Sequence, residues 1–169
     1  MNEIIVTTSR LILRYPVKED IEFMVQLWMD PDMTKYTGGH RERTFLENEF
    51  NNATLPEKRE EYALWVLEER ESKRLIGSAG FIPKEIDGKI YVELNYYIEK
   101  KYWGMGYAKE ISAGLIHYGF TIKDQNEIIS IIAKNNSVSM KVAESVGMKK
   151  WKQEKRSGEL KYIYKIKRN

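Results

Sequence analysis

The sequence predicts an α/β fold built around a mixed, mostly antiparallel sheet. Three strand-like runs at residues 62–70, 75–83 and 90–98 are joined by the turn-rich segments 71–73 and 87–88. Strands joined this closely pair antiparallel. The last of these runs, and a buried run at 128–133, are each followed by a segment with helical spacing of its apolar residues. Hairpins followed by two strand–helix units predict the mixed sheet.

The other elements follow from apolar periodicity. A first helix is expected before Asp30-Pro31, on an apolar stripe made of Ile21, Met24, Val25, Leu27 and Trp28. A second helix is expected at 107–118, with Lys109 and Glu110 facing outward. A third helix is expected in the segment 134–148, with Gly147 as the glycine that ends it. Alternating apolar and basic residues at 160–167 predict a final strand.

Two glycines separate the strand at 90–98 from the helix at 107–118. Gly104 and Gly106 let the backbone turn through conformations that a Cβ disfavours, and the helix N-terminus behind them presents N–H groups to an anion. This predicts a phosphate-bearing ligand, although an ordinary tight turn would show the same two glycines. NAD and ATP are not supported, because Lys109 replaces the third glycine of the dinucleotide motif and Gly88-Lys89 is not followed by Ser or Thr.

Two motifs occur in order along the chain. The first is Trp-Gly-x-Gly-Tyr-Ala-x-Glu at 103–110, and the second is Asn-x-x-Ser-x-x-Val-x-Glu-x-x-Gly-Met at 136–148. Together they resemble the GNAT superfamily of acetyl-CoA-dependent N-acetyltransferases. Residues 8–16, followed by Glu19-Asp20 and a helical run, resemble the branch that acetylates the N-terminal alanine or serine of ribosomal proteins. The resemblance implies one domain over 1–169, with about six to seven strands flanked by about four helices.

The resemblance also implies site residues. Acetyl-CoA, as co-substrate, would contact Ile98, Trp103, Gly104, Met105, Gly106, Tyr107, Ala108 and Lys109. Asn136 would contact its pantetheine or adenosine portion, and backbone N–H groups of the preceding strand would polarise the thioester carbonyl. Ser139 is the candidate acid or thiol-positioning group, because it matches the motif serine and faces Ala143 one turn away. Many members of the family carry at the position of Ala143 a tyrosine thought to protonate the departing thiolate, and they carry Gln or Arg at the position of Lys101.

Glu93 is the candidate general base. It interrupts an otherwise apolar and aromatic strand and shares a face with Asn95 and Tyr97. A lysine or polyamine amine with a pKa near ~10.4 is about one part in two thousand neutral at pH 7, a deficit of roughly 4.6 kcal/mol, whereas an N-terminal amine near ~7.8 is about a tenth neutral. Glu93 would act through a water, with a pKa raised by partial burial. The alternative is an exposed strand carboxylate without a role.

Composition bounds the remaining choices. The absence of cysteine excludes thiolate ligands and a cysteine acyl-enzyme, which leaves direct transfer or a serine intermediate. His40 and His117 form no ligand pair, so no metal is expected. Residues 149–169 hold nine Lys or Arg and two Glu, but their alternation favours a solvated sheet face over a nucleic-acid surface. Without a membrane span or signal peptide, a cytoplasmic protein is expected.

The favoured function is therefore direct transfer of an acetyl group to a primary amine, on either a protein N-terminus or a small molecule. Asp30 and Asp32 would attract a cationic amine or simply form a turn. A non-catalytic acyl-CoA sensor and, less favoured, a nucleic-acid-binding protein are the alternatives. Monomer and homodimer both stay open.

Overall fold

The computed structural model describes residues 3–39 and 41–169 of the chain. Within those residues eight strands form one sheet. The elements are β1 (Ile4–Thr7), β2 (Leu11–Arg14), η1 (Lys18–Asp20), α1 (Ile21–Met29), α2 (Pro31–Thr34), α3 (Arg43–Ala53), η2 (Pro56–Lys58), β3 (Leu64–Glu69), β4 (Leu75–Ile86), β5 (Lys89–Ile98), η3 (Lys100–Tyr102), α4 (Tyr107–Thr121), β6 (Glu127–Ala133), α5 (Ser137–Ser145), β7 (Lys149–Arg156) and β8 (Glu159–Lys167). The described residues thus form eight strands and five α-helices, where about six to seven strands and about four helices were predicted.

The sheet is mixed and mostly antiparallel, as predicted. Its strand order is β1-β2-β3-β4-β5-β6-β8-β7, and β5 with β6 is the parallel pair among the described residues. That pairing is limited to Val92 with Ile128 and Glu93 with Ile129. Beyond Glu93 the two strands have no common ladder, so the sheet opens at its centre.

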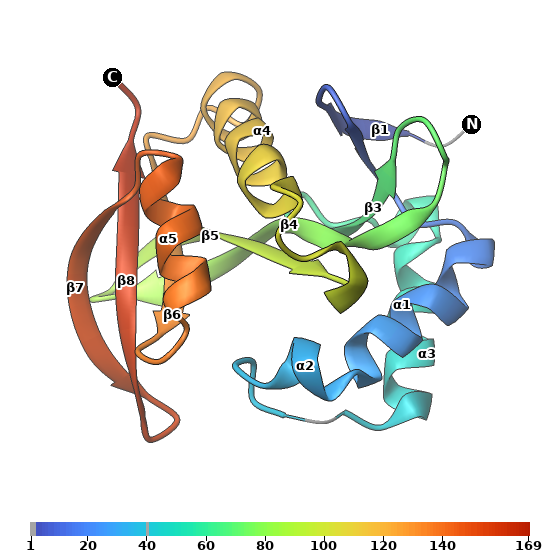
Figure 1. Cartoon of the computed structure of the whole chain (residues 1–169), viewed down its shortest axis with the longest axis horizontal. Coiled ribbons are helices and arrows are strands. Elements are labelled where there is room, and N and C mark those ends of the chain that lie inside the picture. Colours follow the sequence, from blue (N-terminus) through green and yellow to red (C-terminus); the bar gives the residue numbers. More distant parts are fainter. Residues whose placement is uncertain (1–2, 40) are drawn as a thin grey trace.

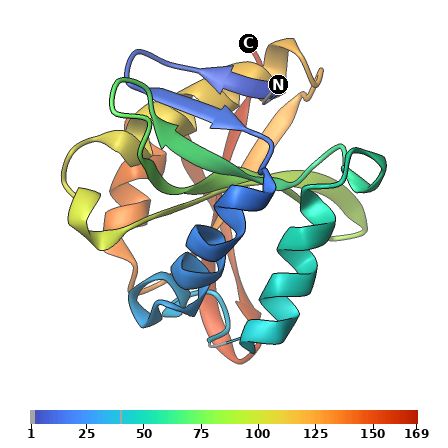
Figure 2. The same cartoon turned by 90° about the vertical axis from the view of Figure 1, so that its right-hand side faces the viewer.

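Helices cover both faces of the sheet. The largest apolar cluster packs α4 and α5 against one face, through side chains that include Ile111, Leu115 and Ala143. A separate cluster on the α1 and α3 side includes Trp28 and Leu46, with Tyr97 of β5 packed against it. Figure 1 shows α4 and α5 next to each other, and Figure 2 shows α1 and α3 together in blue and teal. The opening between β5 and β6 therefore lies between two helical layers.

Several elements fall outside the predicted ones, among them β1, α2, α3 and β7. Helix α3 buries mainly Leu46, with Phe50 packed against the same cluster, so its apolar stripe is narrow. Strand β7 has the sequence KKWKQEKR and pairs with β8 alone, at the edge of the sheet. An edge strand with one neighbour tolerates charged residues at nearly every position, so it carries little apolar alternation.

Two predicted helices shift at their ends. Helix α4 continues to Thr121, three residues beyond the predicted 118. Helix α5 begins at Ser137 instead of 134, because the Asn136 side chain accepts a hydrogen bond from the Ser139 backbone N–H at 3.1 Å and caps the helix there. The turn at Gly147, with φ of +91°, ends it as predicted.

The basic C-terminal strand is an interior strand. β8 pairs with β6 on one side and β7 on the other. Lys165 and Lys167 both form ion pairs with Glu127 of β6, and Lys161 pairs with Glu159. Part of the local positive charge is therefore compensated within the sheet itself.

Candidate active site

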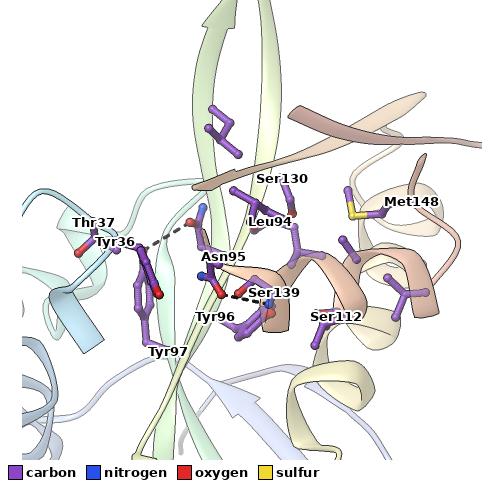
Figure 3. A pocket seen from close by; sticks show the side chains of 16 residues that line it. Tyr36, Thr37, Leu94, Asn95, Tyr96, Tyr97, Ser112, Ser130, Ser139 and Met148 are labelled. Carbon is purple, nitrogen blue, oxygen red and sulfur yellow. Dashed lines mark hydrogen bonds between the residues drawn. The ribbon is translucent and has the colours of Figure 1, made fainter. Parts of the chain in front are cut away.

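The opening between β5 and β6 contains a cavity of about 100 Å³. Its walls come from four places in the chain: the loop after α2, β5, β6 and α5, with Ser112 added from α4. Its lining includes Tyr36, Asn95, Tyr96, Ser112, Asn136, Ser139 and Ala143, and Figure 3 shows how several of them converge. A cavity this small fits the narrow reacting end of a substrate, while the rest of a larger ligand would lie along the open edge.

Past Glu93 the edge of β5 that faces β6 has no ladder partner. The Leu94 carbonyl accepts a hydrogen bond from the Ser130 hydroxyl at 3.0 Å, which places this edge of β5 toward the cleft. Alternate residues of a strand direct their backbone groups to the same side. The next such residue, Tyr96, therefore directs its backbone N–H into the opening, where it can donate a hydrogen bond to a ligand.

Glu93 is buried, with 6 % of its surface exposed, so the alternative of an exposed strand carboxylate is wrong. Its Oε1 accepts a hydrogen bond from the Ile131 backbone N–H at 3.3 Å. The Glu93 side chain is on the same face of β5 as Asn95, which lines the cavity, but Glu93 is not part of the cavity wall. That a water carries the proton to Glu93 stays a prediction.

Burial raises the pKa of the Glu93 carboxyl, and the nearby charges of Lys84 and Arg156 oppose part of that rise. A carboxyl with a raised pKa is a better match to a general base working near neutral pH than an exposed one. Burial also raises the pKa of the neighbouring Tyr97, and the charge of Glu93 adds to this. Tyr97 therefore stays neutral at ordinary pH.

The predicted glycine turn is present between β5 and α4. Gly104 and Gly106 have φ values of +76° and +80°, a left-handed conformation that favours glycine. A Cβ on Gly104 would meet no atom within 4 Å, so space in front of the turn is free. Residues 103–106 and Lys109 are exposed, and the first backbone N–H groups of α4 have no acceptor inside the helix. The chemistry of the turn fits a phosphate group.

Arg10 holds this turn from the other end of the chain. Its guanidinium donates to the Met105 carbonyl at 3.0 Å and to Glu110 at 2.7 Å, and lies 4.5 Å from the centroid of the Tyr107 ring. Glu110 also accepts hydrogen bonds from Thr8, Ser9 and the Arg10 backbone. Burial would raise the pKa of Glu110, but these hydrogen bonds lower it overall. The prediction that Glu110 faces outward is therefore wrong.

Trp103 connects the same turn to the end of β5. Its indole N–H donates to the Ile98 carbonyl at 2.7 Å, while 51 % of the residue stays exposed. The Ile98 carbonyl is thereby occupied, which leaves its backbone N–H as the group that could meet a ligand. The exposed ring of Trp103 remains available beside the glycine turn.

Helix α5 forms the opposite wall of the cleft. Asn136 lines the cavity while its side-chain oxygen caps the helix, so its amide nitrogen is the group left for a ligand. Ser139 and Ala143 both line the cavity, as their predicted common face requires. The structure therefore brings the predicted residues of the second motif to the cleft.

Tyr96 and Ser112 are cavity residues that the sequence analysis did not single out. Tyr96 reads as one of several aromatic residues in β5, and Ser112 reads as a helix position among apolar ones. Both have a buried hydroxyl without a hydrogen-bond partner among the described residues. Tyr36 comes from the loop after α2, and Lys161 donates to its carbonyl at 3.4 Å. The one available signal was helical spacing: Ser112 follows Ala108 by four residues, so the two lie on the same face of α4.

Two expectations concern metals and membranes. Residues 3–39 and 41–169 contain no group of three or more His, Cys, Asp or Glu side chains suited to a metal ion, and His40 lies outside the described residues. In the same residues, no helix has the length and apolar character needed to cross a bilayer.

The family model of the acetyltransferase (GNAT) domain matches residues 10–149. The chain belongs to this family, and it is a GNAT-type acyltransferase.

Individual proteins agree with this assignment. The chain is 31 % identical over 151 residues to the uncharacterised N-acetyltransferase p20 of Bacillus licheniformis, covering 85 % of this chain and 81 % of p20. Its fold is similar to that of RimL, a ribosomal L7/L12 alpha-N-protein acetyltransferase solved with coenzyme A, with a TM-score of 0.79, 15 % identity and 98 % of each chain covered. It is also similar to spermidine N-acetyltransferase from Vibrio cholerae, solved with CoA and spermine, with a TM-score of 0.78, 20 % identity and coverage of 94 % and 96 %. At these identities the two structures show the common fold.

Proposed function

We propose that this protein transfers an acetyl group from acetyl-CoA directly to a primary amine. The observation that carries the proposal is the divergence of β5 from β6, which opens a cleft bordered by the glycine turn and by the strand that carries Glu93. Each part of the reaction then has a matching group along one path. The absence of cysteine from the whole sequence favours direct transfer over an acyl-enzyme.

The phosphate end of acetyl-CoA would lie on the glycine turn. Backbone N–H groups at the start of α4, together with the positive end of the helix, suit a pyrophosphate. Gly104, Met105, Gly106 and Lys109 are exposed there, and Tyr107 and Ala108 begin the helix. The pantetheine arm would pass Ile98, Trp103 and Asn136 toward the cavity. The Tyr96 backbone N–H would then polarise the thioester carbonyl.

The amine would approach from the face that carries Glu93, Asn95 and Tyr97. Only a neutral amine attacks a thioester, so the proton must leave before or during attack. Glu93 would accept this proton through a water held near Asn95. A base of this kind contributes about 10²–10⁴-fold to the rate.

Charges near the cleft favour an acceptor with a single amine. The cavity wall contains no acidic side chain among the described residues, and the charges acting on Glu93 come from Lys84 and Arg156. Asp30 caps α2 through the Asp32 backbone, and the Asp32 carboxylate pairs with Lys100 at 2.9 Å, so both have structural roles. In the described part of the cavity wall, a polyamine would find no carboxylate for its second amine. The N-terminal amine of a peptide is the acceptor class best supported.

The test is release of free CoA from acetyl-CoA with a panel of amines, read alongside calorimetric binding of acetyl-CoA. The panel contains Ala- and Ser-terminated peptides, spermidine and aminoglycosides. We expect release with the peptides and weaker or no release with spermidine. Binding without release from any amine would favour the acyl-CoA sensor, and absence of binding would overturn the proposal.

A further inference from the structure

Tyr96 has a hydroxyl group that its protein surroundings do not satisfy. The side chain lines the cavity, and its Oη is fully buried without a hydrogen-bond partner among the described residues. Buried hydroxyl groups nearly always have a partner, so an exception calls for an explanation. A ligand atom that enters the cavity would supply the missing partner.

The position of Tyr96 is opposite to that of Glu93. Strand alternation puts Glu93 on the α1 side of β5 and Tyr96 on the side of α4 and α5. Figure 3 shows Tyr96 between β5 and α5, next to Ser139, with Ser112 nearby on α4. A thioester held at the Tyr96 backbone would thus have the attacking amine on one face of β5 and the departing sulfur on the other.

Tyr96 also lies against the place where α5 lacks a hydroxyl of its own. Ala143 is buried in the cavity wall and offers only a methyl group. Ser139 is one turn away on the same helix, but an aliphatic hydroxyl is a much weaker acid than a phenol. The ordinary pKa of tyrosine, about 10, is close to that of a thiol at about 8.5. A phenol at this position is therefore the better matched donor to sulfur.

We propose that Tyr96 donates a hydrogen bond and then a proton to the sulfur of CoA as the acetyl group leaves. This inference rests on the proposed acetyl-CoA function. The amine nitrogen forms the new C–N bond, the C–S bond breaks, and its electron pair moves to sulfur. The Tyr96 hydroxyl gives its proton to that sulfur. The proton lost by nitrogen passes through a water to Glu93, which later releases it to solvent. The phenolate regains a proton from solvent, so that the products are the amide and CoA thiol.

Burial supports this role by keeping the phenol protonated. It raises the pKa of Tyr96, and the neighbouring Ser139 hydroxyl opposes part of that rise. The donor is consequently present across the neutral pH range.

The decisive variant is Tyr96→Phe, which removes one buried oxygen that has no hydrogen-bond partner among the described residues. We expect the melting temperature to be unchanged or higher, the Kd for acetyl-CoA to change less than threefold, and kcat to fall roughly 10²-fold. Tyr118→Phe is the matched control. Tyr118 is a partly buried tyrosine on α4 that packs edge-on against Trp65 and does not line the cavity, so its loss should leave kcat unchanged.

A second readout needs no acetyl transfer. The thiol of bound CoA is titrated by the ultraviolet absorbance of its thiolate, in the wild-type protein, Tyr96→Phe and Tyr118→Phe. A hydrogen bond from Tyr96 stabilises the thiolate, so the thiol should titrate about one to two pH units lower in the wild type than in Tyr96→Phe. The Tyr118→Phe complex should match the wild type.

Outcomes separate this inference from the proposed function. Wild-type turnover together with unchanged kcat and unchanged thiol titration in Tyr96→Phe would overturn the role of Tyr96 alone. A wild-type protein that binds no CoA would overturn the proposed function and this inference with it. A larger loss in Ser139→Ala than in Tyr96→Phe would assign the donor role to Ser139 and overturn the inference.

Discussion

Glu93 accepts a hydrogen bond from the backbone N–H of Ile131, although its own ladder partner in β6 is Ile129. A side chain thus replaces the backbone pairing at the point where β5 and β6 separate. The same carboxylate has a raised pKa because it is buried. Glu93 therefore fixes the inner end of the cleft and has the properties expected of a base.

Glu93→Gln should separate these two roles. The Gln side-chain oxygen can still accept from Ile131, so we expect the fold and acetyl-CoA binding to be retained, while kcat falls by about 10²-fold or more because the base is lost. Glu93→Ala removes the acceptor as well and should also lower stability, by about 1–3 kcal/mol. Steady-state kinetics and urea unfolding of both variants are the measurements. Equal turnover in Glu93→Gln and wild type would remove Glu93 from the mechanism.

The stability difference between wild type and Glu93→Gln should depend on pH. Because burial raises the pKa of Glu93 in the folded state, its favourable contribution is present below its unfolded pKa of about 4.3 and is lost as pH rises through the folded pKa. Gln has no such loss. The variant should gain stability relative to wild type as pH rises from 4 to 8, by about 1.4 kcal/mol for each unit of pKa shift. A constant difference across this range, in urea unfolding series, would contradict the buried carboxyl.

Gly106→Val should abolish acetyl-CoA binding. Its φ of +80° is unfavourable for a β-branched residue, at a cost of roughly 1–2 kcal/mol or more, and the new side chain would enter the space proposed for the pyrophosphate. Gly88→Val is the matched control, because Gly88 has φ of +78° with nothing within 4 Å of its Cβ position and lies in the β4–β5 hairpin. Calorimetry should show binding for Gly88→Val and none for Gly106→Val. Loss in both would indicate a general effect on folding.

Arg10→Ala should weaken acetyl-CoA binding, although Arg10 does not line the cavity. Arg10 fixes the Met105 carbonyl between the two glycines and pairs with Glu110 at the start of α4. Loss of these two contacts should raise the Kd for acetyl-CoA about tenfold, since the ligand must then order the glycine turn. Arg43→Ala is a control, because Arg43 forms a comparable exposed network with Glu22 and Glu47. Similar Kd values for the Arg10→Ala and wild-type proteins would exclude this role of Arg10.

Asn136→Ala should destabilise α5 by about 1 kcal/mol, because the side chain caps the helix at Ser139. Asn136→Asp keeps the cap and removes the amide nitrogen that we propose for ligand contact. Thermal unfolding should therefore separate Ala from the other two proteins. Binding measurements should instead place both variants below wild type. Full binding by the Asp variant would leave Asn136 with a capping role only.

The sequence predicted most of the fold because its strands and helices carry clear apolar periods. The glycine turn was predictable for a different reason, since its conformation requires particular residues at 104 and 106. Helix α3 was missed because it buries few side chains, and β7 because an edge strand has no apolar alternation. These elements are held by neighbours more than by their own pattern.

The site was predicted less completely. Residues within a motif, such as Ser139 and Asn136, were found because helical spacing brings them to one face. Glu110 was placed wrongly because helical periodicity describes a helix alone, whereas its partners at Thr8, Ser9 and Arg10 come from the distant β1–β2 turn. Tyr96 and Ser112 line a cavity because β5 and β6 separate, and no local sequence pattern indicates that separation.

The same separation has a consequence for the cohesion of the whole molecule. In its backbone pairing, the sheet consists of β1 to β5 on one side and β6, β8 and β7 on the other. Within the described part of the chain, two residue pairs join these two sides. A molecule bound in the cleft would contact both parts of the sheet and hold them together. Binding only the intact form, it would raise the free energy of unfolding in proportion to the logarithm of its concentration above Kd. The resistance of the protein to unfolding would then follow the amount of substrate around it.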